Sequence, residues 1–197
     1  MRLALIRHGI TAWNAQGRIQ GRTDIPLSKE GAEDMARLSP PDGFAQARAF
    51  TSPLLRARQT AELLGLRNVE ADERLAEHFW GAWEGLTREE IFAHHGVDAF
   101  RHAGNALDFC PLNGETTRDF LARVADFLKE VSREDTDAIA ITHRGVMRSA
   151  YALATGWDMT EPMPPEMDVS CALIIELDKK GDATLAALNV PLRPKTG

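Results

Sequence analysis

Residues 2–9 read Arg-Leu-Ala-Leu-Ile-Arg-His-Gly, and this stretch decides the fold. Residues 2–7 are mostly apolar without a helical period and lead directly into His8 and Gly9, as a strand buried in a parallel sheet does. Residues 137–142 have the same character and also run into a histidine, His143. The carboxyl ends of parallel strands meet at one edge of an α/β sheet, so we expect His8 and His143 to lie close together there.

Helical and extended segments alternate around these two strands. Ser28 and Ser52-Pro53 are typical helix starts, and Thr87 with Glu90 forms a capping box. The last two predicted strands look like a hairpin that extends the sheet at one edge. The predicted helices cover residues 29–38, 53–64, 88–95, 116–133 and 146–155, and the further strands cover residues 47–51, 68–71, 169–177 and 184–190. We expect one domain over residues 1–197, with an excursion at 96–115 that covers the site.

Composition excludes several classes of protein. The 197 residues carry a net charge of -6, which disfavours a general attraction to nucleic acid or to anionic lipid. The apolar runs are far shorter than the roughly 18 residues of a membrane span, and the apolar stretch before Arg7 is too short for a secretory signal. Two cysteines, Cys110 and Cys171, make no disulfide framework and fit a reducing compartment. We therefore expect a cytoplasmic protein with no nucleic-acid or membrane partner, and the sequence leaves a homodimer open.

The candidate site combines histidines with arginines. Arg7 adjoins His8, and Arg56 lies near the start of the helix after Ser52-Pro53. Guanidinium groups around imidazoles suit a phosphoryl group, whose oxygens need several charge-assisted donors. A neutral His8, with its other ring nitrogen held by a backbone carbonyl, is the candidate nucleophile for an attack on phosphorus.

The leaving group of such a reaction needs a proton. Glu77 lies beside Phe79 and Trp80 and is the candidate general acid. A structural ion pair with Arg74 is the alternative role for Glu77, and Glu84 is the alternative acid. Asn14 and Thr142 are candidate donors to the phosphate oxygens.

Four blocks of sequence, in this order, resemble the histidine phosphatase superfamily of phosphoglycerate mutase-like proteins. The blocks are Arg7-His8-Gly9 with Thr11 and Asn14; Ser52 to Ala61; Leu75-Ala76-Glu77 with Gly81 and Trp83-Glu84-Gly85; and Thr142-His143-Arg144-Gly145. The resemblance implies a three-layer α/β/α sandwich with a mostly parallel sheet and an antiparallel edge. It also implies a phosphohistidine at His8, a phosphate pocket of Arg7, Arg56 and His143 assisted by Asn14, proton donation by Glu77, and no metal or other cofactor.

Two positions depart from the family pattern. Ile10 stands where many members have Glu, and Arg144 stands where Gly is frequent. Arg144 could face the sheet, the pocket rim or a second anionic group of the substrate. The identity of the substrate therefore stays open.

Within this family, length and the Trp83 to Thr87 stretch are similar to the small phosphatases, including α-ribazole phosphatases. Mutases carry adjacent arginines in the insertion, whereas residues 96–115 hold only Arg101. We expect a metal-independent phosphomonoester hydrolase that acts on a small phosphorylated metabolite. A phosphoglycerate mutase and a non-catalytic module that binds a phosphorylated ligand are the alternatives.

A metal site has one weak candidate. The spacing of His95, Asp98 and His102 could serve a zinc ion on one helical face, but Gly96 interrupts the helix. The sequence therefore favours no metal site.

Overall fold

The computed structural model describes residues 1–96, 107–159 and 167–195, and within these ranges six strands form one sheet in the order β4-β3-β5-β1-β6-β7. Strands β4, β3, β5 and β1 are parallel, whereas β6 pairs antiparallel with β1 and β7 pairs antiparallel with β6. The strands of this sheet are β1 Arg2–Arg7, β3 Arg48–Thr51, β4 Glu70–Ala71, β5 Ala138–Thr142, β6 Ala172–Leu177 and β7 Ala183–Val190. A separate pair consists of β2 (Leu38–Ser39) and β8 (Arg193–Pro194).

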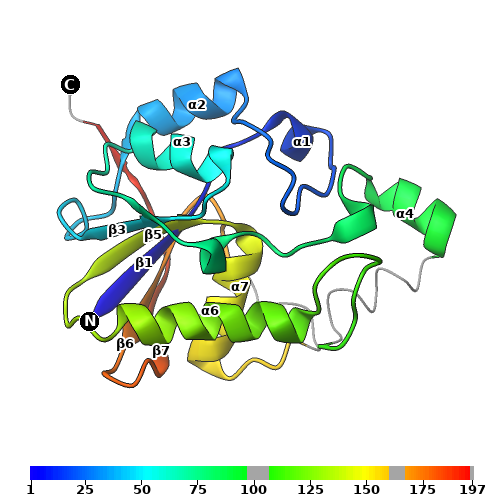
Figure 1. Ribbon diagram of the computed structural model, residues 1–197. Helices are drawn as coiled ribbons and strands as arrows, with labels where there is room; N and C mark the ends of the chain where they lie inside the picture. Colours follow the sequence, from blue (N-terminus) through cyan, green and yellow to red (C-terminus); the bar gives the residue numbers. More distant parts are fainter. Residues whose placement is uncertain (97–106, 160–166, 196–197) are drawn as a thin grey trace.

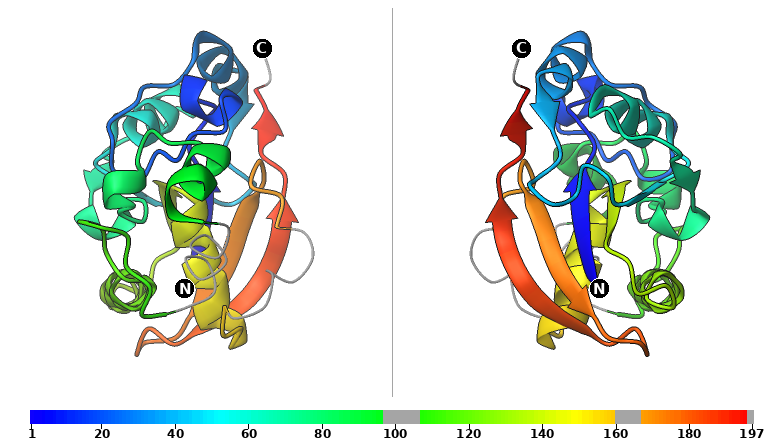
Figure 2. Two further views of the ribbon diagram at one scale, coloured as in Figure 1. Left: turned by 90° about the vertical axis from the view of Figure 1, so that its right-hand side faces the viewer. Right: turned by 90° about the vertical axis from the view of Figure 1, so that its left-hand side faces the viewer.

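Helices cover both faces of the sheet (Figure 1). Helices α2 (Lys29–Ala36) and α3 (Leu55–Leu63) lie on one face, and α6 (Thr117–Val131) and α7 (Arg144–Thr155) lie on the other (Figure 2). This arrangement confirms the expected three-layer sandwich with an antiparallel edge. The other elements within the described ranges are α1 Ala12–Ala15, η1 Glu73–Leu75, η2 Gly81–Trp83 and α4 Arg88–His95. Within the described ranges, no helix has the length and apolar character that crossing a bilayer requires.

The side chains of β1 explain why this strand occupies the middle of the sheet. Leu3 and Leu5 belong to the core under α6 and α7, while Ala4 and Ile6 belong to the core under α3. All four are buried, because alternate side chains of a strand point to opposite faces and both faces are covered by helices. The apolar run therefore fixes the position of the residue that follows it, His8.

Two local differences from the sequence-based prediction lie next to the site. Helix α3 begins at Leu55 rather than Pro53, because the Ser52 side chain contacts His143 instead of capping the helix. The carboxylate of Asp24 accepts from the amide of Leu55 (2.6 Å) and caps the helix from another segment. The second difference is α1, a short helix inside the predicted loop, which starts at a capping box between Thr11 and Asn14.

The predicted excursion is described only in part. Residues 107–115 lie against η2, where the amide of Ala82 donates to the carbonyl of Leu112 (2.9 Å). Residues 97–106, which include Arg101, Asp98 and His102, lie outside the described residues, as does the side chain of His95. That the excursion covers the site, and that the chain forms one domain, stay predictions.

Gly31 offers a test of how α2 packs on the loop after β1. A Cβ atom at Gly31 would overlap the backbone carbonyl of Ile10. In an open helix Gly→Ala is favourable by about 1 kcal/mol, but here the backbone of the loop would have to move. We expect Gly31→Ala to lower the free energy of unfolding by about 1–3 kcal/mol, measured by urea denaturation followed by circular dichroism.

The matched control is Ala32→Gly on the same helix, which should cost about 1 kcal/mol through propensity alone. A stabilising effect of Gly31→Ala would contradict the packing of α2 described here.

Candidate active site

The carboxyl ends of β1 and β5 bring His8 and His143 together. The strands are paired in parallel with Arg7 opposite Thr142, and the amide of His8 donates to the carbonyl of Thr142 (2.9 Å). The two buried imidazole rings have centroids 5.1 Å apart. The residues are remote in sequence and adjacent in space, as the strand pattern predicts.

The hydrogen bonds of His8 define which ring nitrogen can react. Its Nδ1 lies 2.7 Å from the backbone carbonyl of Gly9, and a carbonyl can only accept, so Nδ1 carries the proton. Burial, followed by the charges of Arg7 and Arg56, lowers the pKa of His8 well below its usual value. The ring is therefore neutral, and Nε2 keeps a lone pair.

The ring of His143 is also neutral. Burial, together with His8 and the nearby arginines, lowers its pKa well below the usual value. Its Nε2 lies 2.8 Å from the hydroxyl of Ser52, while its buried Nδ1 has no hydrogen-bond partner among the described residues. If Ser52 donates its hydroxyl proton to Nε2, Nδ1 carries a proton that is available to an anion.

Arg56 is fully buried and is held in place by a loop. Its two terminal nitrogens donate to the carbonyls of Thr23 (2.9 Å) and Gly21 (2.7 Å). The loop is anchored in turn by Glu84, whose carboxylate accepts from the amides of Arg22 and Thr23 (2.8 Å each) and from the hydroxyl of Thr23. Glu84 is thus engaged in holding the loop under Arg56.

Gly21 makes this anchoring possible. Its φ is 51°, in the left-handed region, and a Cβ atom there would overlap the carboxylate of Glu84. The glycine lets the loop approach Glu84 closely enough to present two carbonyls to Arg56.

Glu77 follows η1 and is held at the start of α7. Its carboxylate accepts from the amides of His78 (2.8 Å) and Gly145 (3.2 Å). A helix N-terminus attracts a carboxylate, because its first amides lack partners within the helix. Gly145 permits this approach, since a Cβ there would overlap the Glu77 carboxylate. The alternative ion pair of Arg74 with Glu77 is not made, because Arg74 pairs with Asp72 and Glu130.

Arg123, on α6, fixes the backbone that carries Glu77. Its guanidinium donates to the carbonyls of Arg74 (2.7 Å), Ala76 (2.8 Å) and Glu77 (2.9 Å). It also forms a two-pronged ion pair with Glu115 (2.7 and 3.1 Å). Burial acts to raise the pKa of Glu115, but the hydrogen bonds and charge of Arg123 lower it below its usual value. No sequence pattern predicts this pair, because neither residue lies in a local motif.

Of the two predicted polar donors, Asn14 and Thr142, only Asn14 is among the described residues that line the cavity. Asn14 lines the cavity, and its Oδ1 accepts from the amide of Thr11 (3.0 Å) in the capping box. Thr142 is fully buried, does not line the cavity, and donates its hydroxyl proton to the carbonyl of Leu75 (2.8 Å). The prediction that Thr142 donates to a phosphate is therefore wrong in this structure. Side chains alternate between the two faces of a sheet, and that of Thr142 points toward η1.

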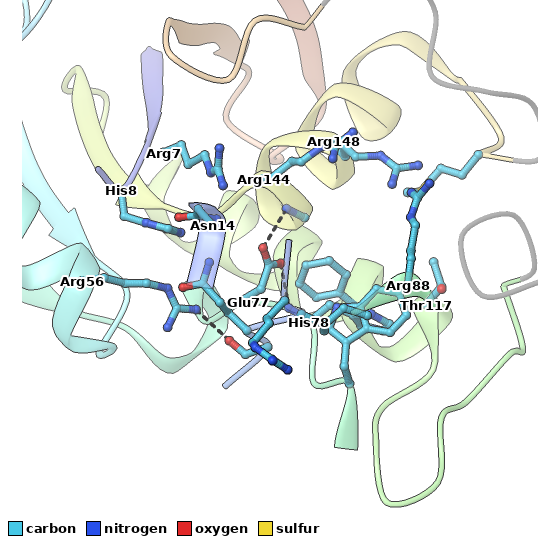
Figure 3. A pocket seen from close by; sticks show the side chains of 18 residues that line it. Arg7, His8, Asn14, Arg56, Glu77, His78, Arg88, Thr117, Arg144 and Arg148 are labelled. Carbon is cyan, nitrogen blue, oxygen red and sulfur yellow. Dashed lines mark hydrogen bonds between the residues drawn. The ribbon is translucent and has the colours of Figure 1, made fainter. Parts of the chain in front are cut away.

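These groups line a cavity of about 260 Å³, and most of the charged side chains on its wall are positive (Figure 3). Its volume lies near the small end of ligand pockets, which hold about 300–1,000 Å³. Glu77 is the one carboxylate among its described lining residues, whereas the arginines that line it are Arg7, Arg18, Arg56, Arg88, Arg144 and Arg148. His143 lies next to His8 rather than on the wall. The arrangement can bind an anion and present it to a neutral imidazole and a carboxyl group.

Comparison with known proteins identifies the family. The model of the histidine phosphatase superfamily (branch 1) matches residues 3–191. The chain belongs to the histidine phosphatase superfamily. The sedoheptulose 1,7-bisphosphatase of Saccharomyces cerevisiae is 35% identical over 79% of this chain and 68% of its own length. A 2,3-bisphosphoglycerate-dependent phosphoglycerate mutase of Methylobacterium radiotolerans is 30% identical over 95% of this chain and 94% of its own.

The fold comparison agrees with this assignment. The solved structure of Bacillus stearothermophilus YhfR is 32% identical and covers 96% of each chain with a TM-score of 0.83. The chain is therefore an enzyme of the histidine phosphatase superfamily, whose relatives here include both phosphatases and mutases.

The contact between Gly145 and Glu77 can be tested by adding a methyl group. Gly145→Ala should displace the Glu77 carboxylate while the protein remains folded, because a side chain rather than backbone is in the way. We expect kcat/KM for an alkyl phosphate, which reports the transfer to the enzyme and whose alkoxide needs a proton, to fall by about 100-fold. The kcat/KM for p-nitrophenyl phosphate, whose leaving group departs without a proton, should fall much less.

Ser149→Ala is the control on the same helix. The Ser149 hydroxyl is buried with no hydrogen-bond partner in the described ranges, so its removal should leave both rates unchanged. Equal losses on the two substrates in Gly145→Ala would show that Glu77 is not displaced as a proton donor.

Proposed function

We propose that this histidine phosphatase family member hydrolyses phosphomonoesters of small metabolites through a phosphohistidine at His8. The observation that carries the proposal is a neutral His8, with its free Nε2, on the wall of an arginine-lined cavity that also holds Glu77. An imidazole in that state is a nucleophile without prior loss of a proton. Figure 3 shows Arg7, His8, Arg56 and Glu77 around the same space.

In the first step the phosphoryl group moves to the enzyme. The Nε2 lone pair of His8 forms an N–P bond while the P–O bond to the leaving alcohol breaks. The electron pair of that bond goes to the alcohol oxygen, which takes a proton from the carboxyl group of Glu77. Arg7, Arg56 and Asn14 hold the phosphoryl oxygens as charge is redistributed among them.

In the second step water removes the phosphoryl group. The Glu77 carboxylate accepts a proton from water, whose oxygen bonds to phosphorus as the N–P bond breaks. The electron pair returns to Nε2, and Glu77 is protonated again for the next turnover. The sum is ester plus water giving alcohol plus inorganic phosphate.

The nearby cations support a reaction without a metal ion. Arg7 and Arg56 supply the positive charge and the directed N–H donors that a phosphoryl group needs. His143 adds a candidate donor through Nδ1, which has no hydrogen-bond partner among the residues that the structure describes. We propose that these groups take the part that a metal ion plays in other phosphatases.

Phosphoglycerate mutase activity is the second candidate, and the 30% identity to a mutase over most of both chains favours it. A mutase shares the first step but returns the phosphoryl group to a second hydroxyl group before water intervenes. It would need a bisphosphorylated primer and would release little inorganic phosphate. A phosphate-release assay separates the two activities, and α-ribazole phosphate belongs in its substrate panel.

The intermediate gives the sharpest test. Rapid quench with a ³²P-labelled phosphomonoester, in the presence of a chelator, should show acid-labile and base-stable label on His8. His8→Ala should lose the label and reduce kcat by roughly 10³-fold or more. Unreduced turnover in His8→Ala would contradict the mechanism, and ligand-induced stabilisation without turnover of any ester would favour a binding module.

A further inference from the structure

Two arginines of α7 line the cavity without a hydrogen bond or an ion pair to any described residue. Arg144 begins the helix, and Arg148 lies one turn later on the same face. No hydrogen bond or ion pair joins either guanidinium to another residue in the described part of the chain, and the buried Nε of Arg148 is unsatisfied. Arg148 instead stacks on the ring of Trp157 at 5.4 Å. Arg144 and Arg148 are called the rim pair below.

The rim pair stands in an unfavourable electrostatic position. Like charges one turn apart repel, and a cation at a helix N-terminus opposes the helix dipole. Burial, and then the charge of Arg144, lower the pKa of Arg148 below its usual value. Each of these effects destabilises the charged guanidiniums, and each is relieved when an anion lies between the two side chains.

Two other arginines of the cavity already bond to protein groups. Arg18 donates to the carbonyl of Gly85 and pairs with Glu90 (3.2 Å), and Arg56 donates to two loop carbonyls. Arg7 and Arg56 suffice for a phosphoryl group, which carries a charge of about -1.5 to -2 near neutral pH. The positive charge of the rim pair is therefore not neutralised when the phosphoryl group binds.

The positions of these groups suggest what fills the rest of the cavity. Figure 3 shows His8 and Arg56 on one side of Glu77, and Arg148 on the other. A proton donor acts on the oxygen between the phosphoryl group and the leaving alcohol, so the space beyond Glu77 is where the alcohol part lies. Arg148 lies at that part of the cavity, and the charge of Arg144 acts on both Arg7 and Arg148.

We infer that the substrate carries a second anionic group, a carboxylate or a second phosphate, on its alcohol part, and that Arg144 and Arg148 bind it. This inference rests on the proposed function for the direction of the substrate. The site selects a phosphorylated acid or a bisphosphorylated metabolite over an uncharged phosphomonoester. Selection arises because an uncharged alcohol leaves Arg148, whose buried Nε has no partner among the described residues, unpaired beside Arg144.

Binding of phosphonates tests the subsite without requiring turnover. The probes are an alkylphosphonate, the same chain ending in a carboxylate, and the same chain ending in a second phosphonate, each with two to five carbons. Calorimetry on the wild-type enzyme should show that at least one chain length with a second anion binds about tenfold or more tightly than its uncharged match. The two anionic series distinguish a carboxylate from a phosphate as the second group.

Arg144→Gln is the decisive variant, because Arg144 is exposed and its loss leaves no buried group unpaired. It should weaken binding of the preferred dianionic probe by about tenfold and change binding of the alkylphosphonate by less than twofold. Arg58→Gln, an exposed arginine of α3 outside the cavity, should change neither. The preference should also shrink as salt is raised.

The outcomes separate the two proposals. No preference for a second anion at any chain length, or equal losses for both probe types in Arg144→Gln, would overturn the rim-pair inference while leaving hydrolysis intact. Normal discrimination among the phosphonates with no phosphate release from any ester would keep the subsite and reject the proposed hydrolysis.

Discussion

The site depends on one hydrogen bond, from Nδ1 of His8 to the carbonyl of Gly9. It joins a side chain to the backbone one residue further on, so it forms as soon as the chain turns at the end of β1. The turn is fixed from the other side, because the amide of Gly9 donates to the hydroxyl of Thr60 on α3 (2.9 Å). Thr60 in turn donates to the carbonyl of Arg56 (2.7 Å). The helix that presents Arg56 therefore also fixes the tautomer of the nucleophile.

Charge explains why both histidines are kept neutral. The chain is acidic overall, at -6, yet six guanidiniums and one described carboxylate line the cavity. Protonation of His8 and His143 would add two buried positive charges close to these arginines. Burial and the repulsion from the arginines therefore both favour neutral rings. The same cations then attract an anionic ligand, and local charge rather than net charge decides what the protein binds.

The sequence predicts the parts of the structure that follow from local patterns. The apolar runs before His8 and His143, and the helical period of residues 116–133, each specify an element and its buried face, and they matched the observed β1, β5 and α6. What it could not predict are contacts between distant segments. The sequence predicts that Ser52 caps a helix, but its hydroxyl contacts His143. It predicts that Thr142 donates to a phosphate, but its hydroxyl donates to the carbonyl of Leu75. The Arg123–Glu115 pair has no local signature at all.

The most direct measurement of the central claim is the protonation state of the His8 ring, read from ¹⁵N–¹H correlation spectra of histidine-labelled enzyme and assigned with a His8→Gln variant. Across pH values of about 8 to 6, around the ordinary histidine pKa of about 6.5, the account predicts a neutral ring with the proton on Nδ1 and a bare Nε2. A ring that becomes protonated near pH 6.5, or that carries its proton on Nε2, would contradict it.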